Sequence, residues 1–185
     1  KGPGAVYDPS APGGAINMVS KRPSAEAVRE VSVSLGNRNR RQGSFDIGGA
    51  MNADGSLLFR LNGVLRNSDG QTDYSRDDRS FIAASLTWMP SARTKVTLMA
   101  EATRDRTTPK SIWPQGALIT PNPWGSIPRE RYIGEPGYDR YNRDAFSLTY
   151  LFEHQLSDNW TLRQNARHAR LDIDYRQVYG TGFQS

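Results

Sequence analysis

The sequence predicts an all-β fold: an antiparallel transmembrane β-barrel segment of about seven strands, preceded by a short region of different character. Three observations support this fold class. Apolar and polar residues alternate along the chain from Val28 onward. The connections between the alternating stretches are short and long in turn. Aromatic residues gather near the ends of the stretches, as they do at the two interfaces of a membrane.

The composition permits a barrel and argues against other classes. The chain has 185 residues, a mean hydropathy of −0.68 and no cysteine, which excludes disulfides and thiolate metal sites. It contains no run of roughly 18 apolar residues, the length that a membrane-spanning helix requires. A β-barrel does not need such a run, because only alternate residues of each strand face lipid. The net charge of +5 comes from Lys and Arg residues interleaved with Asp and Glu, which favours a solvated surface over a nucleic-acid partner.

Residues 1–27 differ from the rest of the chain. Glycine and proline are dense there, and they mark turns and close backbone packing. The apolar residues 15–19 predict a buried strand, which ends before Pro23 because proline donates no hydrogen bond to a ladder. The chain shows neither an initiator methionine nor a signal peptide, so we expect the parent protein to be longer.

The predicted strands are recognised by apolar residues at every second position, the period of a strand with two different faces. In the last stretch the apolar residues change phase, and a bulge near Ala169 would explain this change. The alternating apolar residues are Val31, Val33 and Leu35; Phe45, Ile47 and Gly49; Phe59, Leu61, Gly63 and Leu65; Ile82, Ala84, Leu86 and Trp88; Val96, Leu98, Ala100 and Ala102; Phe146, Leu148, Tyr150 and Phe152; and Trp160 and Leu162, followed by Leu171, Ile173 and Tyr175.

The predicted connections are sorted by length. Because consecutive hairpins turn at opposite edges of a sheet, all short turns lie at one edge and all long links at the other. This sorting is typical of outer-membrane barrels and has no reason in a soluble meander. The short turns are predicted at residues 52–55, 90–94 and 157–159, and the longer links at 36–41, 67–79 and 104–143. The aromatic residues that suit interfacial girdles are Trp88, Phe152, Trp160 and Tyr175.

About seven strands with a polar second face do not make a closed object. A polar face needs water, so the lumen must be wide or plugged, and wide barrels have many strands. Unpaired edges at the first and last strands would also invite aggregation. We therefore expect further strands to follow Ser185 in the parent protein.

Two motifs in the first 23 residues carry a resemblance to a known family. Residues 1–6 read KGPGAV and residues 12–23 read PGGAINMVSKRP. These motifs resemble the end of the plug domain of TonB-dependent ferric-siderophore receptors, β-barrel transporters in the outer membrane of Gram-negative bacteria. Weaker motifs in the family's order follow at residues 41–49, 74–79, 86–90 and 160–165, so the resemblance covers essentially the whole chain. It implies a larger, plugged barrel of about 22 strands.

The resemblance implies a division of the chain and a function. Residues 1–27 would be the C-terminal end of the plug domain, and residues 28–185 the N-terminal part of the barrel. The receptor would bind a ferric siderophore outside the cell and import it with energy from the TonB complex, which contacts a segment upstream of Lys1. Outer-membrane lipid would be its other partner. No cofactor is expected, because the iron arrives within the siderophore. The plug-motif residues are Gly2, Pro3, Pro12, Gly13, Gly14, Asn17, Lys21, Arg22 and Pro23.

The plug motif also has a simpler, structural explanation. Gly13 and Gly14 permit close backbone approach, and they form with Asn17 a turn-and-packing signature that needs no ligand. Lys21 and Arg22 can pair with carboxylates on the polar barrel wall. The spacing between the two motifs is slightly shorter than the family's and contains an unusual Asp-Pro pair at residues 8–9.

The candidate ligand-binding residues are aromatic rings and an arginine. Tyrosine and tryptophan offer flat apolar area with a hydrogen-bonding tip, and arginine offers an anionic chelate a charge and several donors. Most of the candidates lie in the longest predicted link, and links of that length are often functional. A self-packed extracellular loop is the alternative. The candidates are Tyr7, which best matches a tyrosine of the family's plug loop, and Trp113, Trp124, Tyr132, Tyr138 and Arg140.

No pattern in the sequence predicts an enzyme. His154 and His168 lack the spacing of metal ligands, and no carboxylate has an identifiable partner for acid–base catalysis. No phosphate loop or nucleophile elbow occurs. Two alternatives to siderophore import remain. The same barrel could import another nutrient, such as cobalamin or a saccharide. The chain could instead be a soluble β-sheet module for adhesion or nucleic-acid binding, against which the sorted loops and the lipid-facing alternation argue.

Overall fold

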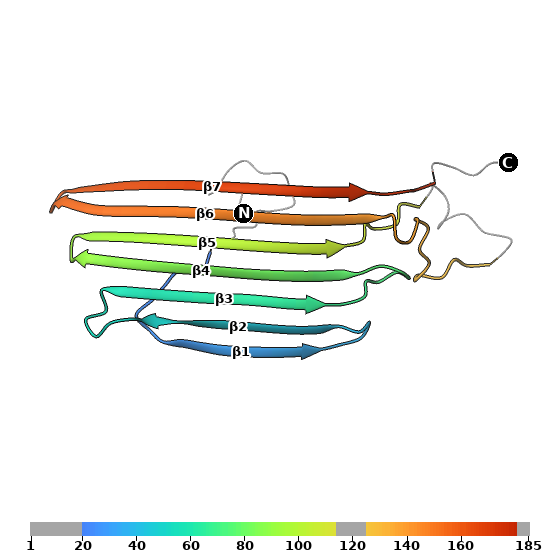
Figure 1. Cartoon of the computed structure of the whole chain (residues 1–185), viewed down its shortest axis with the longest axis horizontal. Coiled ribbons are helices and arrows are strands. Elements are labelled where there is room, and N and C mark those ends of the chain that lie inside the picture. Colours follow the sequence, from blue (N-terminus) through green and yellow to red (C-terminus); the bar gives the residue numbers. More distant parts are fainter. Residues whose placement is uncertain (1–19, 114–124, 181–185) are drawn as a thin grey trace, which may run out of the picture.

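The computed structural model describes residues 20–113 and 125–180. Seven strands form one antiparallel sheet in which each strand pairs with its neighbours in the sequence, in the order β1 to β7 (Figure 1). The predicted number, type and order of the strands are therefore confirmed. The described part of the chain contains no helix that is long and apolar enough to cross a membrane. The strands are β1 (Val28–Leu35), β2 (Arg41–Ala50), β3 (Leu57–Asn67), β4 (Asp77–Ser91), β5 (Thr94–Thr107), β6 (Arg140–Ser157) and β7 (Trp160–Arg176).

One face of the sheet, here called the apolar face, carries the predicted alternating hydrophobic residues. Directly paired residues share a face, so the register joins Phe45 to Gly63 and Gly63 to Ile82 across β2, β3 and β4. Many of these side chains are bare: Val31 is 78% exposed and Val33 is 76% exposed. The apolar face comprises Val31, Val33, Phe45, Ile47, Phe59, Leu61, Leu65, Ile82, Leu86, Trp88, Val96, Leu98, Phe146, Leu148, Tyr150 and Phe152.

The opposite face, here called the polar face, holds nearly everything that is buried. Asp46 is 4% exposed and Thr87 is 1% exposed, and the Thr87 and Thr97 hydroxyls are hydrogen-bonded at 2.8 Å. Residues 20–22 lie on this face, because Ser20 donates to the Glu101 carboxylate and Arg60 donates to the carbonyl of Arg22. A soluble protein buries its apolar residues and exposes its polar ones. This sheet does the reverse, as expected of a barrel wall with lipid outside and a filled lumen inside.

The predicted sorting of the connections by length is confirmed in part. The turns β2–β3, β4–β5 and β6–β7 lie at one edge of the sheet, and the other three connections lie at the opposite edge (Figure 1). The β1–β2 connection, predicted as a longer link, spans only 36–40 and is one residue shorter than the β2–β3 turn at 51–56. Two long links are shorter than predicted, spanning 68–76 and 108–139, because β4 begins at Asp77 and β5 continues to Thr107. The added residues are polar on both faces and show no alternation. They are held in the ladder by ion pairs between neighbouring strands.

The predicted bulge near Ala169 is wrong. β6 and β7 pair without interruption from Gln155 opposite Thr161 to Arg140 opposite Arg176. The change of phase therefore moves the apolar residues of β7 to the other face of the sheet. It leaves the hydrogen-bond ladder between β6 and β7 intact. Leu171, Ile173 and Tyr175 lie on the polar face, while Arg170, Asp172 and Asp174 alternate with them on the apolar face.

The two faces predict opposite responses to a buried charge. Leu61→Arg places a cation on the apolar face and should destabilise the intact protein in a bilayer by about 2–4 kcal/mol. Asn62→Arg points the other way, beside Glu30 and Asp46 in a space of about 160 Å³, and should be tolerated. Urea unfolding of both variants in lipid vesicles measures the difference. Equal losses of stability would show that the face assignment of β3 is wrong.

Candidate functional site

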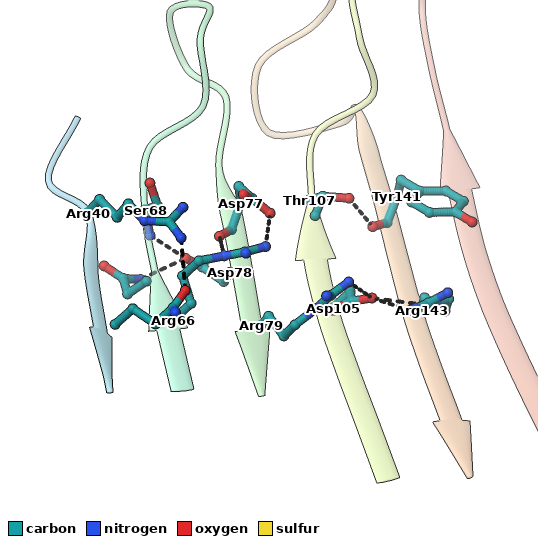
Figure 2. A network of polar contacts seen from close by, with 12 residues as sticks. Arg40, Arg66, Ser68, Asp77, Asp78, Arg79, Asp105, Thr107, Tyr141 and Arg143 are labelled. Atoms are coloured by element: carbon teal, nitrogen blue, oxygen red, sulfur yellow. Dashed lines mark hydrogen bonds and ion pairs between the residues drawn. The ribbon is translucent and has the colours of Figure 1, made fainter. Parts of the chain in front are cut away.

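A ladder of charged residues crosses the polar face near the long links (Figure 2). Asp105 on β5 is buried and forms ion pairs with residues of both neighbouring strands, Arg79 of β4 at 2.7 Å and Arg143 of β6 at 2.7 Å. On β3, Arg66 pairs with Asp77 at 2.6 Å. Charge-assisted hydrogen bonds of this kind are roughly twice as strong as neutral ones. They hold the ends of β3 to β6 together where apolar packing has ended.

Next to this ladder, two tyrosines pair on the polar face at the ends of β6 and β7, here called the tyrosine cluster: Tyr141 and Tyr175. Their rings meet edge to face, with centroids 5.8 Å apart. Tyr138 does not belong to this cluster, because its ring lies 5.8 Å from the guanidinium of Arg176, which the register places on the apolar face. Both rings of the cluster are more than one third exposed. Leu171 and Ile173 lie on the same face as Tyr175, so the cluster continues into an apolar strip on the otherwise polar wall.

The link before β6 is folded around one carboxylate. Asp139 is buried and accepts hydrogen bonds from the Tyr132 hydroxyl at 2.5 Å, the Glu135 amide at 3.0 Å and the Val178 amide at 2.8 Å. Burial and the Asp139 carboxylate raise the pKa of Tyr132 well above its usual range. The Tyr132 hydroxyl therefore stays protonated and keeps donating. Asp139 joins the end of this link to the chain that follows β7.

The neighbouring links at this edge are hydrogen-bonded to one another. Arg38, in the β1–β2 turn, donates to the carbonyls of Gly70 and Gln71 at 3.0 and 2.7 Å. The amide of Asp73 donates to the carbonyl of Glu130 at 2.7 Å. A connected set of bonds thus runs from the β1–β2 turn through both longer links, and Asp139 extends it to the end of β7. The tyrosine cluster lies on a rim that is ordered by these contacts.

At mid-height, the segment before β1 is anchored to the polar face. The Lys21 ammonium lies 2.5 Å from the Asp46 carboxylate, which also accepts two hydrogen bonds from Arg60 at 2.9 Å. The predicted pairing of the plug motif with wall carboxylates is confirmed for Lys21. Arg22 contributes its main-chain carbonyl instead, and Pro23 is half-buried beside it.

The structure brings only some of the predicted ligand-binding residues together. Arg140 lies on the apolar face, where it pairs with Asp174 at 2.6 Å, and Tyr138 lies near it against Arg176, so neither joins Tyr141 and Tyr175 on the polar face. The Tyr132 hydroxyl is bonded to Asp139. Trp113 is half-buried in the chain after β5. Tyr7, Trp124 and the motif residues Gly2, Pro3, Pro12, Gly13, Gly14 and Asn17 lie outside the described residues.

The sequence-based prediction missed the second half of the site. The sequence predicts Tyr175 in an interfacial girdle, but the register places it on the polar face opposite Tyr141. The signal that could have found it is the change of phase along β7, which moves three apolar residues to the other face. Within residues 20–113 and 125–180, no group of three or more histidine and acidic side chains is arranged to hold a metal ion. The rim offers rings, hydroxyls and guanidinium groups, which are groups for binding.

The Asp139 contacts predict that Gly134 is irreplaceable. A methyl group added there would lie 1.9 Å from Asp139 Oδ2 and 2.6 Å from the Tyr132 hydroxyl oxygen. Gly134→Ala should therefore break these hydrogen bonds and raise hydrogen exchange at the Val178 amide roughly ten-fold or more. The exposed Ser126→Ala, in the same link, should leave exchange unchanged. Wild-type exchange in Gly134→Ala would refute the role of Asp139.

Known proteins resemble this chain over nearly its whole length. No protein-family model matches the chain. The ferrioxamine B receptor of Salmonella typhimurium is 32% identical over 99% of this chain. The ferrichrome outer membrane transporter and phage receptor of Escherichia coli K12 is 34% identical over 98% of it. The crystal structure of the ferric-catecholate import receptor Fiu of Escherichia coli K12, in its closed form, superposes with a TM-score of 0.75 and 25% identity over 95% of the chain.

The chain spans about a quarter of the length of the curated relatives it matches, 26% of the ferrioxamine B receptor and 25% of the ferrichrome transporter. It likewise covers 26% of the solved catecholate receptor. The matches extend over essentially the whole chain, including residues 1–23, which carry the plug motif, and the relatives are receptors and transporters. The chain belongs to the TonB-dependent siderophore receptors of the Gram-negative outer membrane.

Proposed function

We propose that the whole protein binds a ferric siderophore on the tyrosine cluster and imports it with energy supplied by the TonB complex. The observation that carries this proposal is the position of the cluster: exposed rings on the lumenal wall, at the edge with the longer links. The relatives' names supply the ligand class, since they bind ferrioxamine B and ferrichrome. The iron arrives within the chelate, so the protein needs neither a cofactor nor metal ligands of its own.

The chemistry of the rim suits a compact chelate. Tyrosine rings cover flat apolar parts of a ligand, and their hydroxyls bond to its oxygen atoms. The arginines on the same face share a carboxylate, since Arg79 and Arg143 both contact Asp105. This trio keeps a net charge of +1, which attracts anionic ligands while each guanidinium group has a partner. This balance favours neutral or weakly anionic chelates.

The proposal includes the division of the chain. Residues 1–27 are the end of a plug, and residues 28–185 begin the barrel. Two observations support this division. Residues 20–22 contact the polar wall through Ser20 and Lys21, as the end of a plug would. In addition, β1 and β7 each pair with one strand among the described residues, so the barrel requires further strands. The TonB-contacting segment lies before the plug residues of this chain.

Loss of a ring from the tyrosine cluster should weaken binding. Tyr175→Ala removes ring packing and one hydroxyl, which is worth roughly a ten-fold loss in affinity. Tyr175→Phe should lose less, because it keeps the ring. Tyr150→Ala is the matched control, since Tyr150 lies on the apolar face of β6 and should leave affinity unchanged. Fluorescence titration of the intact receptor with ferrioxamine B and ferrichrome measures the effect. Wild-type affinity in Tyr175→Ala for both chelates would refute this site.

The lengths of the connections predict the orientation in the membrane. The longer links should face the outside of the cell, and the short turns the periplasm. The chain has no cysteine, so Ser126→Cys in the link before β6 and Ala92→Cys in the β4–β5 turn give one thiol each. An impermeant maleimide applied to whole cells should label Ser126→Cys and spare Ala92→Cys. Equal labelling, or labelling of Ala92→Cys alone, would contradict this orientation.

A further inference from the structure

Two arginines and one carboxylate form a compact charged group on the polar face, next to the tyrosine cluster (Figure 2). Asp105 on β5 lies directly opposite Arg79 of β4 and directly opposite Arg143 of β6, and the three residues are here called the Asp105 trio. Arg143 and Tyr141 are two residues apart on β6 and lie on the same face, so their backbones are about 7 Å apart. A ligand that contacts the tyrosine cluster therefore lies within reach of the trio.

The trio hides its carboxylate and displays its cations. The side chain of Asp105 is 7% exposed, whereas those of Arg79 and Arg143 are 41% and 35% exposed. Arg79 donates to both carboxylate oxygens, from Nε at 2.7 Å and from Nη2 at 3.2 Å. Arg143 donates from Nε at 3.0 Å, and its Nη2 lies 2.7 Å from the same carboxylate. A guanidinium has five N–H donors, so each arginine keeps donors for a ligand in the lumen.

The charge of this part of the wall depends on Asp105. Two guanidinium groups and one carboxylate give the trio a net charge of +1. The neighbouring Arg66 pairs with Asp77 at 2.6 Å, and this pair is neutral. Without the Asp105 carboxylate, the two guanidinium groups of the trio would carry a charge of +2 and would lose their shared counter-ion. Such a pair would bind anionic oxygen atoms strongly, because charge-assisted hydrogen bonds are roughly twice as strong as neutral ones.

We propose that Asp105 is a specificity-determining residue, which screens Arg79 and Arg143 and thereby disfavours strongly anionic chelates relative to neutral ones. This inference rests on the proposed function and adds the charge class of the chelate. Specificity is a difference between two affinities, and a site can gain it by weakening its binding of the wrong ligand. The Asp105 carboxylate does this, because it cancels half of the positive charge that the two arginines bring to the lumen.

Two ferric chelates that differ in charge test the proposal. In ferrichrome, three hydroxamate anions neutralise the charge of iron(III). In a hexadentate ferric tris-catecholate, three dianions surround the same ion, so the complex is trianionic. Both chelates hold the iron through oxygen atoms, and the ratio of their affinities therefore reports mainly on charge. Fluorescence titration of the intact receptor in detergent measures both affinities, and the wild-type protein should prefer ferrichrome.

Asp105→Asn keeps the size of the side chain and removes its charge. The affinity for the tris-catecholate should rise roughly ten-fold at low salt, because the added positive charge attracts every negative charge of the chelate. The affinity for ferrichrome should change far less, because this chelate has no net charge. High salt should reduce the gain, since salt screens exposed charges. Arg143→Gln removes one cation from the trio and should lower the tris-catecholate affinity by a similar factor.

Asp144→Asn is the matched control. Asp144 also pairs with two arginines, Arg104 at 3.2 Å and Arg106 at 2.8 Å, and it lies on the neighbouring strand β6. It is on the apolar face, however, so the sheet separates it from the lumen. The same change of charge at this position should leave the ratio of the two affinities at its wild-type value.

Four outcomes would contradict the role of Asp105. An unchanged affinity ratio in Asp105→Asn would leave the trio as an ion pair that only joins strands. An equal rise in Asp144→Asn would show a general effect of net charge. If Asp105→Asn does not fold, an unchanged ratio in Arg143→Gln would overturn the proposal. A wild-type protein that binds neither chelate would overturn the proposed function and this inference with it, whereas ferrichrome binding with an unchanged ratio overturns this inference alone.

Discussion

The rest of the structure depends on a single constraint: each backbone group that crosses the membrane must find its hydrogen-bond partner within the sheet. The uninterrupted registers of β2 with β3 and of β5 with β6 meet this requirement. The pairing then forces side chains to alternate between two media. Exposed Val31 and buried Thr87 both suit a barrel wall, whose outer face is apolar and whose inner face is polar. The Lys21–Asp46 pair joins the segment before β1 to the polar face.

Ion pairs carry the strands beyond the apolar belt. A membrane needs roughly 9–11 residues per strand, whereas β6 has 18 and β7 has 17. Apolar packing cannot hold the additional residues together, because they stand in water on both faces. Asp105 between Arg79 and Arg143, and Asp144 between Arg104 and Arg106, hold them instead. The tyrosine cluster lies on this extended part of the wall.

The end of β7 serves both faces at once. Arg170 and Asp172 lie on the apolar face, while Leu171 and Tyr175 lie on the polar face. This is possible because successive side chains of a strand point to opposite faces, so one stretch of sequence supplies residues to both surfaces. The two faces of the wall are therefore separated by the thickness of one backbone. Substitutions one residue apart change different faces.

The sequence by itself determined the seven strands, the short turns, the apolar face of β1 to β6 and the plug motif, because these depend on local periodicity and turn chemistry. Tertiary structure alone decided the rest. β4, β5 and β6 extend into predicted links because Asp77, Asp105 and Arg143 find partners far away in the chain. The face of Tyr175 follows from its register with Tyr141, and the role of Asp139 from its contacts with Tyr132 and Val178. Such pairings join residues that no local pattern connects, so only the folded chain reveals them.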